Sequence, residues 1–363
     1  MQFLPQTYTV KEERKNNMNE EEIYGQPMQG VEQPPLMAEV KEAQMHFSKL
    51  GFMYLLGTLI VFGVQYGVLR LLYLLKPEWL VNDNLYFLFM MVPMYAIAMP
   101  IMMLLIKTVP GKKIEKHKMN AGQMILAFFM GYAILYVSNI IGTFITLFIG
   151  ILKGSAVENE LTEIITGISP WLTLFFVVIC APVMEELIFR KLLVERTVKY
   201  GEGVAVLLSG LMFGLFHGNL NQFAYAFTIG MFFAFIFVKT GKIIYTIILH
   251  MIINFMGSEV SMWVLEKSGI DRILETEGDM NAMMQVTMEI LPQIFIVMLY
   301  FFLLIASVLT GIILLIVMRK RFTCRPGEVV LPKGKRFKTV IVNLGMGIFL
   351  ILWLILIVVQ LFL

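Results

Sequence analysis

Long apolar stretches recur along the chain, and they constrain the fold more than any other feature of the sequence. They lie at about 52–75, 85–106, 122–152, 171–194, 203–218, 222–238, 243–257, 286–318 and 340–363. Most of them are long enough to cross roughly 30 Å of hydrocarbon as helices. A helix satisfies all its backbone hydrogen bonds within one segment, as lipid requires. The sequence therefore predicts an all-α, polytopic transmembrane helix bundle of about eight to nine spans.

The composition excludes a water-soluble protein. Of the 363 residues, 58% are hydrophobic and only 15% are charged, and the mean hydropathy is +0.77. This leaves too little polar surface to cover a fold in water. The net charge of +3 is small and the basic residues form short clusters, so no nucleic-acid partner is expected.

Charge patterning predicts the topology. Residues 1–50 are polar and are expected to form a disordered or loosely helical cytoplasmic tail without a signal peptide. The segments 107–118, 190–199 and 319–338 are rich in Lys and Arg, whereas 153–170 and 258–285 are acidic. The positive-inside rule then predicts a multi-pass integral membrane protein with a cytoplasmic N-terminus, in the plasma membrane if the source is prokaryotic.

Few ionisable groups fall inside the predicted spans, and they are concentrated in three of them. They are Glu185, Glu186 and Arg190 in the fourth span, His217 in the fifth, and His250, with the amide Asn254, in the seventh. Such groups are costly in lipid and mark functional sites by default. At about 1.5 Å of rise per residue, Glu185, His217, His250 and Asn254 lie roughly 10–21 Å from the cytoplasmic end. Side chains from three helices are therefore expected to meet in one layer.

The spacing of these residues predicts distinct roles. Glu186 and Arg190 are four residues apart and are expected to form an intrahelical ion pair, either as scaffold or as part of the site. Glu185 points about 100° away, so it is free to face another partner and to act as a general base. The alternatives are an inert buried Glu185 and a His217 that merely ends its helix beside a polar run. Gly210, Gly214 and Gly218 predict a close helix approach on the helix of His217.

The order Glu-Glu-x-x-x-Arg, Phe-x-x-x-His and His-x-x-x-Asn on successive apolar helices resembles the CPBP family of intramembrane proteases. This family includes the CAAX prenyl endopeptidases and the bacterial Abi proteins. The motifs are Glu185-Glu186 with Arg190, Phe213 with His217, and His250 with Asn254. The resemblance covers about 170–257, the CPBP core helices. Hydropathy and charge divide the rest of the chain into a tail (1–50), N-terminal transmembrane helices (51–169), an extracytoplasmic acidic loop (258–285) and a C-terminal transmembrane hairpin (286–363).

The resemblance implies an endopeptidase in which Glu185, His217 and His250 activate a water. Asn254 would donate a hydrogen bond to the oxyanion, and Glu186 with Arg190 would complete the site. Two His and one Glu are also an adequate ligand set for Zn²⁺, so a metalloprotease with Glu185, His217 and His250 as ligands is the alternative. No His-Glu-x-x-His motif is present, and we favour the metal-free, glutamate-based interpretation with no cofactor.

The expected partner is a membrane-embedded or lipid-modified peptide or protein in the bilayer. CAAX processing, bacteriocin maturation or self-immunity, and membrane-protein turnover all remain open as its source. Two other classes of function stay as alternatives: a non-catalytic immunity or scaffold protein of the same fold, and a proton-coupled transporter. The absence of an internal repeat in the sequence disfavours the transporter.

Overall fold

The computed structural model describes residues 36–155, 157, 167–276 and 278–362, and this part of the chain is helical without a β-strand. The first 35 residues of the predicted tail lie outside this range, as do Glu158, Glu160 and Glu163 of the predicted acidic loop. The described residues confirm the all-α class and the multi-pass membrane architecture.

The N-terminal part contains α1 (Leu36–Leu75), η1 (Pro77–Leu80), α2 (Asp83–Pro93), η2 (Met94–Ala98), α3 (Met99–Lys107) and α4 (Ala121–Lys153). Local sequence sets the ends of α4. Asn120 and Gln123 form a capping box at its start, and Gly154 ends it in the left-handed conformation with φ 76°, which glycine adopts without a steric penalty.

The middle part carries the three motifs. It contains α6 (Pro170–Leu172), η3 (Thr173–Cys180), α7 (Ala181–Glu185), η4 (Glu186–Leu192), α8 (Leu193–Thr197), η5 (Val198–Tyr200), α9 (Glu202–Phe216), α10 (Leu220–Thr240) and α11 (Ile243–Phe255). Asn219 caps the start of α10, since its side chain accepts from the amide of Gln222. The tight turn between α9 and α10 therefore holds the two helices antiparallel and adjacent.

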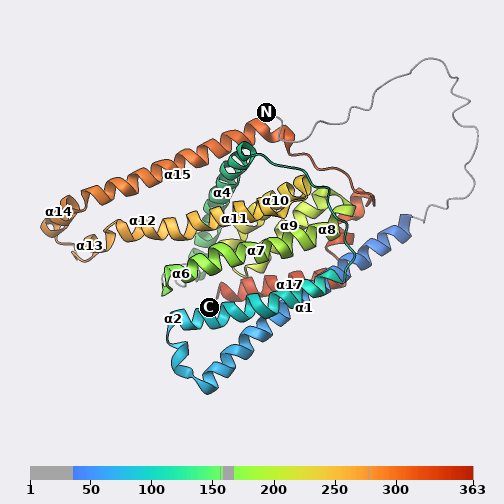
Figure 1. Cartoon of the computed structure of the whole chain (residues 1–363), viewed down its shortest axis with the longest axis horizontal. Coiled ribbons are helices and arrows are strands. Elements are labelled where there is room, and N and C mark those ends of the chain that lie inside the picture. Colours follow the sequence, from blue (N-terminus) through green and yellow to red (C-terminus); the bar gives the residue numbers. More distant parts are fainter. Residues whose placement is uncertain (1–35, 156, 158–166, 277, 363) are drawn as a thin grey trace, which may run out of the picture.

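The C-terminal part continues α11 without a break. It contains η6 (Met256–Val260), α12 (Ser261–Lys267), α13 (Ile270–Leu274), α14 (Met280–Glu289), α15 (Leu291–Met318), η7 (Arg319–Arg321), η8 (Lys333–Lys335), α16 (Arg336–Val340) and α17 (Leu344–Gln360). Figure 1 shows the long helical segments running back and forth between two ends of the bundle, with α1 and α17 side by side.

Seven helices of the described chain are long and apolar enough to cross a membrane, and the bent pair α16 and α17 makes an eighth. The remaining predicted span, 203–218, corresponds to α9, which has only 15 residues. It is shorter than the roughly twenty residues that an isolated span needs, and its neighbours surround it: Leu208, Met212 and Phe213 are almost completely buried.

Two predicted boundaries are wrong. The first helix begins at Leu36, although residues 36–50 were expected to belong to the tail. Ala43, Phe47, Leu50 and Tyr54 are buried, and their spacing of four, three and four is a helical period that the flanking charges obscure. Likewise, 258–267 is helical, because Trp263 and its apolar neighbours extend the helix between the acidic residues, and Val264 is buried in the bundle.

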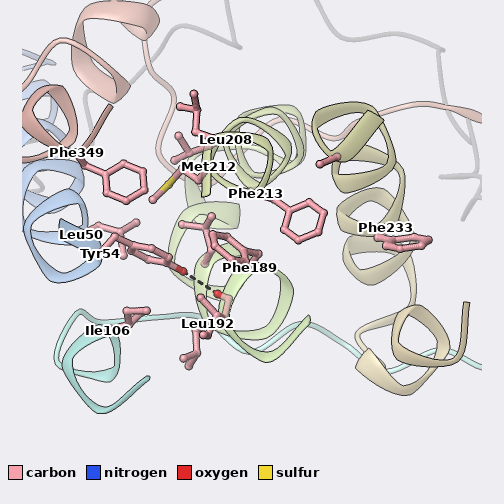
Figure 2. Close-up of a cluster of buried hydrophobic side chains, with 14 of the residues drawn as sticks. Leu50, Tyr54, Ile106, Phe189, Leu192, Leu208, Met212, Phe213, Phe233 and Phe349 are labelled. Carbon is pink, nitrogen blue, oxygen red and sulfur yellow. Dashed lines mark hydrogen bonds between the residues drawn. The ribbon is translucent and has the colours of Figure 1, made fainter. Parts of the chain in front are cut away.

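The largest core cluster joins α1, α3, the fourth span, α9, α10 and α17. In Figure 2, Leu50 and Tyr54 of α1 face Phe189, Leu192 and Phe349 across this core. The buried hydroxyl of Tyr54 donates to the carbonyl of Ile188 at 2.7 Å. This bond ties the first helix to the span that carries the two glutamates.

Three connecting segments meet at one end of the bundle and form what we call the loop clamp: 107–120, 195–202 and 322–332 (Figure 1). The amide of Val329 donates to the carbonyl of Lys199 at 3.0 Å, and the amide of Glu202 donates to the carbonyl of Arg325 at 3.1 Å. Lys112 pairs with Glu328, and the buried pair Lys239–Glu202 lies beneath. The segments approach closely at Gly327, where a Cβ would meet the backbone of Gly201 at 2.4 Å.

Candidate active site

The two adjacent glutamates lie where the fourth span changes its helical pitch. π-helical turns occupy Thr173–Cys180 and Glu186–Leu192, with the short α7 between them. Pro182 lies in α7, and it cannot donate the backbone hydrogen bond that a regular helix needs. Widened turns beside a proline relieve this conflict and are frequent at functional sites. The fourth span therefore accommodates Pro182 by a change in helical pitch.

Glu186 lies at the centre of a buried ionic network. It is completely buried, as is Arg190, and its Oε1 lies 3.2 Å from the guanidinium of Arg190. The same oxygen lies 3.0 Å from Nδ1 of His250 on α11. The structure thus contains the predicted Glu186–Arg190 ion pair and adds His250 as a third member. A buried carboxylate is tolerated when such partners compensate for its desolvation.

Aromatic rings complete the surroundings of Arg190. Its guanidinium carbon lies 4.1 Å from the ring centroid of Phe213 and 5.7 Å from that of Phe233. Figure 2 shows Phe213 between Phe189 and Phe233. The guanidinium nitrogens form no hydrogen bond to described residues, so Glu186 and the ring faces are what stabilise this cation.

Glu185 faces the other edge of the same imidazole. Its Oε2 lies 3.7 Å from Nε2 of His250, and its side chain keeps 19% of its surface exposed, whereas that of Glu186 has none. Glu185 was expected to face a different partner from Glu186, and instead one histidine contacts both. An imidazole has a nitrogen on each of two edges, which permits this arrangement. A donor Nδ1–H toward Glu186 leaves Nε2 with its lone pair toward Glu185.

His217 lies at the end of α9, where Gly218, with φ 69°, terminates the helix. Its Nδ1 bonds to the carbonyl of Phe213 at 2.8 Å, so Nδ1 carries the proton and Nε2 is the acceptor. The Phe213 ring lies between the two histidines, 4.8 Å from the His217 ring and 5.9 Å from the His250 ring by centroid. His217 thus ends its helix, and it also borders the same aromatic centre as His250.

Asn254 lies one turn after His250 on the same helix. Its amide nitrogen donates to the carbonyl of Val177 at 2.9 Å, on the π-helical segment before Glu185. One amide N–H thus fixes α11 against the fourth span, and a second N–H is left for another acceptor.

Thr246 is a neighbour that the sequence reasoning missed. It is fully buried one turn before His250, and its hydroxyl donates to the carbonyl of Ile243 at 3.0 Å. The spacing Thr246, His250, Asn254 places all three on one face of α11, and this periodicity is the signal that could have found it.

The side chains do not fit a metal site as they lie. Within the described residues, no group of three or more His, Cys, Asp or Glu side chains is arranged to hold a metal ion. We therefore derive no step through a metal.

The fold and this cluster define a multi-pass membrane protein with a buried Glu, His and Asn site contributed by three helices. Residues 167–256 match the family described as type II CAAX prenyl endopeptidase Rce1-like. The chain is also 29% identical over 161 residues to the protein named "Putative membrane peptidase YdiL" from Bacillus subtilis (strain 168), a match that spans 42% of this chain and 64% of that protein. No solved structure matches the chain. Both matches agree with the predicted resemblance to the CPBP family, and the matched segment contains all six predicted site residues.

Proposed function

We propose that the protein is a metal-free intramembrane endopeptidase that uses Glu185 as its general base. The observation that carries the proposal is the pairing of Glu185 with Nε2 of His250 at 3.7 Å, while Glu186 holds the opposite edge of the ring at 3.0 Å. The Glu185–His250 distance is too long for a direct hydrogen bond, and a water beside both groups can bond to each of them.

Hydrolysis then follows from the protonation states. Glu185 accepts a proton from the water as the water oxygen bonds to the peptide carbonyl carbon. The other O–H of that water donates to the lone pair on Nε2 of His217 or His250, which orients the water. The free N–H of Asn254 stabilises the oxyanion, a contribution worth about 3–4 kcal/mol. The intermediate collapses as the C–N bond breaks, and protonated Glu185 gives its proton to the leaving amine.

In this proposal Glu186 and Arg190 do not contact the substrate but hold His250 in position. Glu186 fixes the tautomer and orientation of His250, in the way that a buried carboxylate orients a catalytic histidine. Arg190 balances the charge of Glu186 and is held over Phe213, which contacts both histidine rings.

The substrate class in this proposal is a peptide that reaches the site from the membrane. The surroundings of the site are apolar, and the helices that carry it are membrane spans or, for α9, enclosed by them. The family match supports a lipid-modified CAAX-type peptide, and a bacteriocin-type precursor is the other source of the same chemistry.

Purified protein in proteoliposomes tests the proposal. The substrates are a farnesylated CAAX peptide, the same peptide without farnesyl, and membranes of a host cell whose new protein termini are mapped by mass spectrometry. Glu185→Gln, His217→Ala and His250→Ala should each lower cleavage at least about 10²-fold. The matched control is Glu259→Gln, which changes another intramembrane glutamate on the continuous helix that carries His250 and should leave cleavage intact. Full cleavage by Glu185→Gln would overturn the base assignment.

We further infer that the loop clamp faces the cytoplasm. Its segment 107–120 carries five Lys against one Glu, and 195–202 and 322–332 overlap the Lys- and Arg-rich stretches 190–199 and 319–338. Cys324 lies exposed in this clamp, whereas Cys180 is partly buried in a span. In intact cells a membrane-impermeant maleimide should label Cys324 only after the membrane is permeabilised. Labelling before permeabilisation would reverse the orientation.

A further inference from the structure

A cavity of about 390 Å³ borders the candidate site on the side of the terminal helices. It lies between α1, α17 and the end of α9, and His217 forms part of its wall. Its volume is within the range of about 300–1,000 Å³ typical of ligand sites. Because α1 and α17 lie outside the family match at 167–256, the family comparison assigns nothing to this cavity.

Three residues in its wall carry polar atoms without a hydrogen-bond partner among the described residues. These atoms are Oγ1 of Thr58, Nε1 of Trp353 and Oε1 of Gln360. Thr58 is completely buried and Trp353 is 4% exposed. Leaving a buried polar group unpaired costs about 1–3 kcal/mol, so three in one wall indicate a missing partner.

Thr58 departs from the usual behaviour of threonine in these helices. The hydroxyls of Thr143, Thr146 and Thr228 each donate to a backbone carbonyl three or four residues earlier. Thr58 is in the middle of α1 and forms no such bond. The local backbone therefore does not use its hydroxyl, which is available to a ligand.

Trp353 is held rigidly beside His217. Its ring packs against Phe62 and Phe216, with centroids 5.8 and 5.0 Å away. A Cβ at Gly218, the residue after His217, would come within 3.3 Å of this ring. The indole is thus a fixed wall that continues the site.

The chemistry of the wall selects the kind of ligand. The described residues that line the cavity include no Lys, Arg, Asp or Glu, so an anionic headgroup would find no countercharge there. An acyl chain could not bond to the hydroxyl, the indole N–H or the amide. A peptide backbone carries a neutral donor and a neutral acceptor at each residue and can satisfy all three.

We propose that this cavity binds the peptide segment of the substrate next to the bond that is cleaved, with Thr58, Trp353 and Gln360 hydrogen-bonded to its backbone. The inference rests on the proposed function, because His217 joins the cavity to the reacting centre. It assigns substrate selection to α1 and α17, at opposite ends of the sequence and outside the matched segment 167–256.

Trp353 itself supplies the test. In a Glu185→Gln background, with Trp79, Trp171 and Trp263 changed to Phe, Trp353 is the only tryptophan of the chain. The protein in phosphatidylcholine nanodiscs is titrated with a panel of dansylated apolar tripeptide amides and, separately, with a dansylated phosphatidylethanolamine. We expect saturable energy transfer from Trp353 to at least one tripeptide, competed by the unlabelled peptide, and none to the lipid.

Two isosteric changes then locate the site. Thr58→Val and Gln360→Leu should each weaken tripeptide binding about threefold to tenfold. The matched control Thr310→Val, on the exposed face of α15, should leave it unchanged. Saturable transfer to the lipid alone, no saturable transfer to any tripeptide, or equal binding by Thr58→Val and its parent would each overturn the inference.

Failure here and failure of the proposed function are distinguishable. Binding is read in a variant that cannot cleave, so it does not depend on catalysis. Cleavage by the wild type without tripeptide binding at Trp353 would refute only the cavity assignment. Binding without cleavage by the wild type would refute the endopeptidase and leave a peptide-binding membrane protein.

Discussion

Replacing each of the two adjacent glutamates by glutamine should separate stability from activity. Glu186 is fully buried and contacts both Arg190 and His250. Breaking a buried pair by removing one partner costs about 3–5 kcal/mol. In Glu186→Gln, Arg190 would keep mainly its contact with Phe213 at 4.1 Å, worth about 2 kcal/mol at a desolvated site. We expect the free energy of unfolding to fall by about 3 kcal/mol.

Glu185→Gln should behave in the opposite way. Its side chain is partly exposed and lies 3.7 Å from Nε2 of His250, so the free energy of unfolding should change by less than about 1 kcal/mol. Cleavage should nevertheless be lost, because an amide cannot accept the proton of the water. Glu186→Gln/Arg190→Met should regain most of the lost stability, since it leaves no unpaired buried charge on this helix.

The assay is equilibrium unfolding in mixed micelles, followed by tryptophan fluorescence, with cleavage measured on the same samples. Similar stabilities for the two single variants would refute the division of roles. So would a double variant that is no more stable than Glu186→Gln, because the loss would then not come from an uncompensated charge.

Three further outcomes follow from the geometry. Asn254→Ala should lower kcat about 10²- to 10³-fold with little change in KM, as measured by steady-state cleavage kinetics, and an unchanged kcat would exclude the oxyanion role. Gly210→Ala should destabilise the protein by about 1–3 kcal/mol in thermal unfolding, because the new Cβ would lie 2.6 Å from the carbonyl oxygen of Phe227, whereas Gly67→Ala, with nothing within 4 Å, should not. Glu202→Gln should speed limited cleavage after Glu328 by a glutamate-specific endoprotease, because Glu202 accepts from the amide of Arg325 at 2.8 Å and pairs with Lys239, and unchanged cleavage would show that this carboxylate does not hold the loop.

Much of the fold could be predicted because hydrocarbon imposes a simple rule on sequence. Each predicted apolar stretch corresponds to a helical segment, since spanning lipid allows few alternatives. The errors arose where polar residues hid a helical period. Glu39, Lys41 and Glu42 surround the first turns of α1, and the buried spacing of Ala43, Phe47 and Leu50 was overlooked.

For the candidate site, the sequence could predict that side chains from three helices lie at a similar depth in the membrane, but it could not predict which of them are in contact. Positions four residues apart predicted the Glu186–Arg190 ion pair, because helix geometry alone determines that distance. The bond between Glu186 and His250 could not be predicted, because it depends on how α11 is rotated against a π-helical turn. The cavity beside His217 was equally hidden, since Thr58 and Trp353 are almost three hundred residues apart in the chain.

The loop clamp has a consequence for biosynthesis. Its last segment includes Arg325 and Val329, roughly 70 residues after the end of the matched core at 256. At about 5–20 residues per second of synthesis, roughly 4–14 seconds pass between synthesis of the core helices and synthesis of the backbone that covers Glu202 and Lys239. The core helices are therefore complete before the loop clamp can form. A chain that stopped before the C-terminal hairpin would contain every motif of the site but would lack the last segment of the clamp.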